Sequence, residues 1–219
     1  MKLKLAYIIG AIAIASNSNA AIYAVQNVQT GYAYGDGLFQ NANNSLLDGG
    51  IVAMGVFSGT GFQEFDIATT IGNFQILASG FAGTNSALLG GAFPGYVQSV
   101  FDTANIEGVN PLIGQDLYVF VGNAATLAAS TTFGLFKTAT IQSDIPNEQT
   151  YLANPFSAIN AGELLLGEAG TFTGNASGLE APDAIFPTLK LAAAPVPEPS
   201  AAILGGLGAL IACVRRRRN

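Results

Sequence analysis

The chain has 219 residues, a formal net charge of −6, a single cysteine and no histidine. Without histidine it cannot build serine-histidine or cysteine-histidine catalysis, a histidine-ligated zinc site or a c-type haem site. The acidic balance argues against nucleic acid as a partner, because such binding needs a basic surface.

The N-terminus has the pattern of a secretory signal peptide, residues 1–20. Lys2 and Lys4 precede an apolar run, and small residues lead to a predicted cleavage between Ala20 and Ala21. A buried N-terminal helix is the weaker alternative, because the run is short and its charge lies on the N-terminal side. The sequence therefore predicts an exported protein.

The middle of the chain, residues 21–195, is acidic. Its basic residues are Lys137 and Lys190, against thirteen of the fourteen acidic residues, which gives this part a net charge of −11. About 175 residues suffice for one domain with a sizeable core. Because the one cysteine, Cys213, lies near the C-terminus, no disulfide is available to this domain.

Short runs of β-branched and aromatic residues, separated by glycine, asparagine, aspartate or proline, predict strands. The predicted strands cover residues 21–28, 31–39, 51–57, 74–77, 96–101, 117–121, 131–137, 162–168 and 185–192. The best helical candidate, residues 126–130, is too short for more than about one turn. The expected fold is all-β, a single antiparallel β-sandwich of jelly-roll-like form that spans residues 21–192.

The C-terminal segment has three parts. A proline-rich linker, residues 193–200, ends in Val196, Pro197, Glu198, Pro199 and Ser200. A short transmembrane segment follows at 201–214, with Ala201, Leu204, Leu207, Leu210, Ile211 and Val214 among its apolar residues. The basic cytoplasmic tail, residues 215–219, holds the stop sequence Arg215, Arg216, Arg217 and Arg218. As a helix the segment spans about 21 Å, short of the roughly 30 Å hydrocarbon core, so it suits a temporary anchor.

These three parts in this order resemble the PEP-CTERM sorting signal of exported bacterial proteins. The resemblance implies that an exosortase recognises the Pro-Glu-Pro stretch and cleaves near Pro197. Signal peptidase, expected from the N-terminal pattern, is the other processing enzyme. It also implies transient anchoring in the inner membrane and delivery to the cell surface, the outer envelope or the extracellular polysaccharide matrix. Residues 114–138 are in addition similar to a β-rich ectodomain of PEP-CTERM proteins that has no assigned function.

Catalysis by two carboxylates is the one enzymatic mechanism left open. Glu64 with Asp66 and Asp102 with Glu107 are candidate pairs of the kind that glycosidases use. Solvated surface acids explain them better, since aspartate and glutamate are almost never fully buried. We therefore expect that the protein is not an enzyme and has no catalytic residues.

Calcium is a weaker hypothesis for the same acidic residues. Asp36, Asp102, Asn105 and Glu107 carry suitable oxygen ligands, but none of them belongs to the calcium-loop motif. Turns in which aspartate and asparagine bond their own backbone explain them better. No metal site and no cofactor are predicted.

Tyr32 and Tyr34 are the candidate ligand-binding residues. At period two on one predicted strand they face the same side and could form a stacking platform for a sugar. Core or cross-strand packing is the simpler explanation.

The leading hypothesis is therefore a structural or adhesive surface or matrix protein. A module that binds extracellular polysaccharide and a two-carboxylate glycan-active enzyme are the alternatives.

Overall fold

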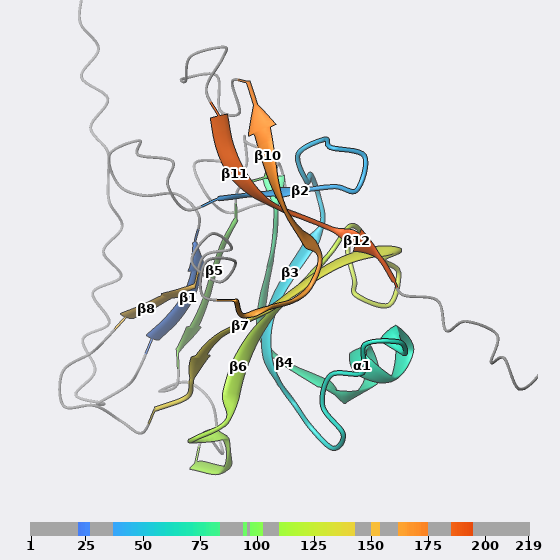
Figure 1. Cartoon of the computed structure of the whole chain (residues 1–219). Coiled ribbons are helices and arrows are strands. Elements are labelled where there is room, and N and C mark those ends of the chain that lie inside the picture. The colour runs from blue at the N-terminus through green and yellow to red at the C-terminus, as the bar shows by residue number, and fades with distance from the viewer. Residues whose placement is uncertain are drawn as a thin grey trace, which may run out of the picture.

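The computed structural model describes residues 22–26, 37–83, 94–95, 97–102, 110–142, 150–153, 162–174 and 185–194. In these residues the fold is mostly β and largely antiparallel, with one short α-helix (Figure 1). The strands form three hydrogen-bonded sheets, which we call the central sheet, the β1 sheet and the β11 sheet.

The central sheet has six strands. They are β3 (Ile51–Phe57), β4 (Phe74–Phe81), β6 (Asp116–Gly122), β7 (Thr132–Thr140), β9 (Leu164–Leu166) and β12 (Ala192–Ala193). Their order is β12-β7-β6-β3-β4, β9 also pairs with β7, and every pairing is antiparallel.

Each of the other two sheets has three strands. In the β1 sheet, β1 (Ile22–Gln26) lies between β5 (Gln98–Asp102) and β8 (Thr150–Ala153). In the β11 sheet, β11 (Ile185–Lys190) lies between β10 (Glu168–Thr173) and β2 (Leu38–Gln40). The pairings β1-β8 and β11-β2 are parallel. The prediction of a purely antiparallel fold is therefore wrong at these two edges, where strands far apart in the sequence meet.

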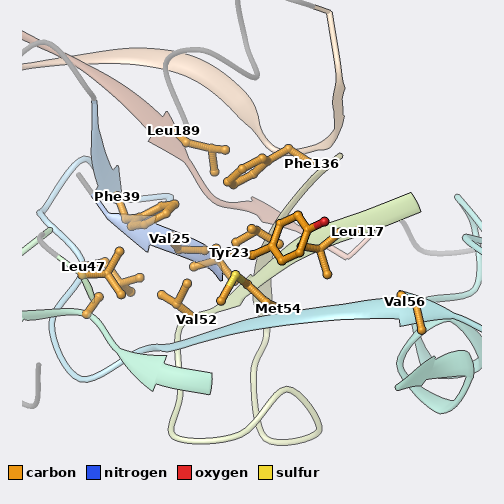
Figure 2. Packing of buried hydrophobic residues seen from close by; sticks show 14 of the residues in the cluster. Tyr23, Val25, Phe39, Leu47, Val52, Met54, Val56, Leu117, Phe136 and Leu189 are labelled. Atoms are coloured by element: carbon orange, nitrogen blue, oxygen red, sulfur yellow. The ribbon is translucent and has the colours of Figure 1, made fainter. Parts of the chain in front are cut away.

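The central sheet is covered on both faces. Successive residues of β3 point to opposite sides, so Val52 and Met54 belong to one apolar cluster and Ala53 to another. The first cluster lies between the central sheet and strands β1, β2 and β11, and includes Tyr23, Val25, Phe39, Leu47, Val52, Met54, Val56, Leu117, Phe136 and Leu189 (Figure 2). The Tyr23 hydroxyl within it accepts a hydrogen bond of 2.8 Å from the backbone N–H of Gln142.

The second cluster lies on the opposite face of the central sheet, which we call the second face. It includes Ile51, Ala53, Phe74, Phe120, Leu127, Phe133, Leu135 and Leu166. Ile67 and Ile71 of the helix α1 (Ile67–Asn73) pack against it. Because β3 and β6 bury side chains on both faces, their sequences are nearly continuous apolar runs.

Helix α1 departs from the all-β prediction. Its isoleucines, threonines and glycine are weak helix formers, so its sequence carries no helical signal. Asp66 caps its N-terminus, the packing of Ile67 and Ile71 attaches it to the second cluster, and the buried Thr70 hydroxyl bonds the backbone of Gln63. The helical candidate at residues 126–130 forms a bend and a turn instead.

Several strand boundaries also differ from the predicted ones. The predicted strand at 162–168 divides at Gly167, whose φ of 102° is one that L side chains rarely adopt, into β9 and the start of β10. The strand at 31–39 is described only from residue 37, and β2 begins at Leu38. The sequence analysis predicted no element at strand β8 or at the short 3₁₀ turn Asn110–Leu112.

Candidate functional site

Charged and aromatic side chains meet on the second face where β6 and β7 pair. Asp116, Tyr118, Lys137 and Thr140 form this group, which we call the ion-pair cluster. The Lys137 Nζ lies 2.9 Å from Asp116 Oδ1, and the Thr140 hydroxyl donates to the same oxygen at 3.0 Å. The Lys137 and Asp116 side chains keep 35% and 39% of their surface exposed, so the cluster is open to a ligand.

Strand register brings the cluster together. Asp116 lies opposite Thr140 and Tyr118 lies opposite Lys137, because the pairing shifts by one residue between Leu117 and Tyr118. Such a shift is a β-bulge, which re-aims side chains where it occurs.

A row of aromatic rings leads from the cluster into the core. Tyr118 lies edge-on to Phe57, with ring centroids 5.0 Å apart, and Phe57 lies 5.1 Å from Phe74. Phe74 contacts Phe120 at 5.4 Å, and Phe120 contacts Phe133 at 5.8 Å. Tyr118 and Phe57 are half-buried, whereas the last three rings are buried. The row therefore ends in two accessible rings beside the ion pair.

The electrostatics of the cluster hold its groups in their ordinary charge states. The hydrogen bond from Lys137 lowers the pKa of Asp116, and the same bond raises the pKa of Lys137. Burial, followed by the negative charge of Asp116, raises the pKa of Tyr118. At neutral pH the cluster thus presents an ionised pair and a neutral phenol. This arrangement suits hydrogen bonding and ring contacts with a polar ligand better than proton transfer.

One member of a candidate carboxylate pair, Asp66, has a structural role. Asp66 caps α1, where its Oδ1 accepts from the Thr69 backbone N–H at 2.9 Å and its Oδ2 from the Thr69 hydroxyl at 2.6 Å. These bonds lower the pKa of Asp66. Within the described ranges no three acidic or cysteine side chains lie close enough to hold a metal ion.

Most of the predicted sites lie outside the described residues. These are the signal cleavage at Ala20 and Ala21, the tyrosines Tyr32 and Tyr34, the motif at 196–200, the segment at 201–214 and the arginines at 215–218. Asp36, Asn105 and Glu107 of the calcium hypothesis lie outside them too, and Asp102 ends β5.

Sequence reasoning did not identify the ion-pair cluster. One signal was present in the sequence, because Lys137 and Lys190 are the only lysines of an acidic middle segment and both fall in predicted strands. Each is paired across two strands, Lys137 with Asp116 and Lys190 with Glu168, the latter at 3.0 Å. The partner of each lysine depends on strand register, which one sequence does not reveal.

No protein-family model, curated protein or solved structure matches the chain. Among the described residues, no helix has the length and apolar character needed to cross a membrane.

Proposed function

We propose that this chain is an exported, non-enzymatic surface or matrix protein of structural or adhesive type, sorted and C-terminally processed by an exosortase. The three-part tail carries the proposal, because a Pro-Glu-Pro motif, a short apolar segment and an arginine block occur in that order. The described fold ends at Ala194, two residues before Val196. Cleavage near Pro197 therefore leaves every described strand in the product.

The domain of this protein is proposed to be one sandwich of jelly-roll-like form. Strands β1, β2 and β11 contribute to the same apolar cluster as one face of the central sheet, which supports two layers of strands around a common core.

The signal peptide and the arginine block support an orientation with this acidic domain outside and the arginines in the cytoplasm. Signal peptidase, exosortase and the inner membrane are its processing partners, and nucleic acid is not a partner.

Intact mass of the native exported protein tests this function, because it defines both termini at once. We expect a chain that starts at Ala21 and ends near Pro197. The Glu198→Ala variant and a variant that lacks Arg215–Arg218 are expected to stay in the inner membrane as precursors. The matched control is Glu64→Ala, an exposed acid of the folded part, which should be exported and processed normally. A mature protein that retains Arg218 would contradict the proposal.

Polysaccharide binding is the second candidate function, and the ion-pair cluster favours it. Tyr118 and Phe57 offer accessible ring surface, and the neighbouring lysine, aspartate and threonine offer donors and acceptors for sugar hydroxyls. The ligand would be a saccharide of the extracellular matrix.

The binding test compares Tyr118→Ala with Tyr118→Phe in affinity electrophoresis through gels that contain the matrix polysaccharide. Loss of the ring should weaken retention at least about tenfold, equivalent to about 1.4 kcal/mol, whereas Tyr118→Phe keeps the ring and should lose less. Variants of Tyr32 and Tyr34 measured in parallel separate this site from the one expected from the sequence. Equal retention of Tyr118→Ala and the parent would contradict a site at Tyr118.

A further inference from the structure

We infer that the saccharide bound at the ion-pair cluster is an uncharged one, a chain of neutral sugars, and that the cluster discriminates against acidic polysaccharides. This inference rests on the proposed polysaccharide binding and names the chemical class of its ligand. It depends on which side chains lie around Tyr118 and on the charge that they carry.

Strand register places an amphipathic row of residues across four strands of the second face. Gly55 of β3 lies opposite Ile76 of β4 on one side and opposite Tyr118 of β6 on the other, and Tyr118 lies opposite Lys137 of β7. Directly opposite residues share one face of a sheet, so Ile76, Tyr118 and Lys137 point to the same side. The row crosses three strand spacings, about 14 Å.

The two halves of this row differ in chemistry. Ile76 is 46% exposed and the half-buried Phe57 ring lies against Tyr118, so this half is apolar. On the other side of Tyr118, Lys137 and Asp116 offer hydrogen-bond donors and acceptors. A neutral sugar matches both halves, because its C–H face packs on apolar and aromatic side chains while its hydroxyls form hydrogen bonds.

The positive charge of the cluster is more than compensated by nearby acids. The Lys137 ammonium lies 2.9 Å from Asp116, and the Glu163 carbonyl oxygen accepts the backbone N–H of Lys137 at 3.1 Å. The hydrogen bond to Asp116 raises the pKa of Lys137, and the negative charge of Glu163 acts in the same direction. Two carboxylates, those of Asp116 and Glu163, therefore act on one ammonium.

The charge of the whole segment acts in the same direction. Residues 21–195 carry a net charge of −11, and their two basic residues, Lys137 and Lys190, each form an ion pair with an acid. An acidic polysaccharide that approaches the cluster is therefore repelled. A carboxylate on every sugar would also lie either over the apolar half of the row or in the field of Asp116 and Glu163.

Chemical forms of one polysaccharide test the inference. The extracellular polysaccharide of the producing cells is used native, with its carboxylic acids reduced to alcohols, and with its primary alcohols oxidised to carboxylates. In affinity electrophoresis at about 20 mM salt, we expect the oxidised form to retain the protein at least about tenfold less than the carboxyl-reduced form. Equal or stronger retention by the oxidised form would overturn the inference.

Two controls separate charge from the change in shape that oxidation causes. Amidation of the oxidised form removes its charge without restoring the alcohols, so it should recover retention. Sodium chloride at about 0.5 M should raise retention by the oxidised form, because salt screens the repulsion. Absence of both effects would show that charge does not set the selectivity, which overturns the inference.

Glu163→Gln tests the source of the repulsion within the protein. It should raise the ratio of oxidised-form to carboxyl-reduced-form retention at least about threefold. Glu168→Gln is the matched control, because it changes the net charge by the same amount at an acid that pairs with Lys190 in the β11 sheet. Equal changes of the ratio in both variants would overturn selection by the cluster.

Tyr118→Ala distinguishes failure of the ligand class from failure of the binding itself. If no form retains the parent, or if Tyr118→Ala is retained like the parent by the carboxyl-reduced form, the proposed binding at the cluster fails, and the inference with it. If Tyr118→Ala loses retention while the oxidised form binds the parent as well as the carboxyl-reduced form does, the binding site stands and the ligand class is wrong.

Discussion

Gly55 shows how one residue shapes the second face. It lies in β3 opposite Tyr118 of β6, at the point where the register between β3 and β4 shifts. A Cβ on Gly55 would lie 2.1 Å from the Gln75 carbonyl oxygen and 2.8 Å from Phe74 Cζ. The absence of a side chain here lets β4 and the Phe74 ring approach β3 and continue the aromatic row.

Gly55→Ala should destabilise the domain by about 1–3 kcal/mol, because backbone and ring must both move. The measurement is the urea unfolding midpoint of the protein. Gly72→Ala is the matched control, because a Cβ there meets nothing within 4 Å and the position is helical. It should stabilise the domain by about 0.5–1 kcal/mol. Equal effects of the two substitutions would contradict the packing argument.

The ion pair makes a pH-dependent contribution to stability. Because the folded state lowers the pKa of Asp116, its contribution is present above the unfolded pKa of about 3.9 and is lost as the pH falls through the folded value. Asp116→Asn should therefore lower the urea midpoint at neutral pH, and the difference from the parent should shrink below about pH 4. Thr140→Val keeps the ion pair and should cost less. A difference that stays constant between these pH values would contradict a stabilising carboxylate.

At the scale of elements, α1 depends on context more than on its own sequence. Seven residues with three β-branched side chains in the first four positions do not form a stable helix alone. The cap at Asp66 begins the helix, and its two isoleucines attach it to the second face.

Asp66→Ala should therefore loosen α1 without unfolding the sheets. The Thr69 amide, which donates to Asp66, should exchange several-fold faster in the variant, while the amides of β6 keep their protection. Asp66→Asn retains a capping oxygen and serves as the control. Unchanged exchange at Thr69 in Asp66→Ala would show that packing alone holds the helix.

At the scale of the whole molecule, charge imbalance is the main electrostatic feature. Residues 21–195 carry a net charge of −11, and both of their lysines are already paired with acids. The remaining acids repel one another, and this repulsion weakens as salt screens it.

The melting temperature of the protein should rise when sodium chloride is increased from about 20 mM to about 0.5 M, because the Debye length shortens to a few Å. At about pH 4 many of the acids are neutral, so the same salt increase should have a smaller effect there. A melting temperature that falls with salt at neutral pH would mean that attraction within the ion pairs outweighs repulsion.

The sequence alone determined where strands can form, and it carries the patterns on which the proposed export and sorting depend. Glycine and proline residues around apolar runs located β3 with its observed bounds, β6 to within one residue at each end, and β7 and β11 to within three residues, because strand pattern and turn chemistry are local properties. The Pro-Glu-Pro tail pattern and the N-terminal signal-peptide pattern are likewise made of neighbouring residues, so both can be recognised without a structure.

Only the tertiary structure decided which segments meet. The parallel pairings of β1 with β8 and of β2 with β11, the bulge that places Tyr118 beside Lys137, and the helix held against the second face all depend on contacts between distant residues. Tyr118 and Asp116 look like ordinary strand residues until the register places Lys137 opposite Tyr118 and within ion-pair distance of Asp116. Pairing partners are chosen by the total burial of the folded domain, a property that no single segment carries.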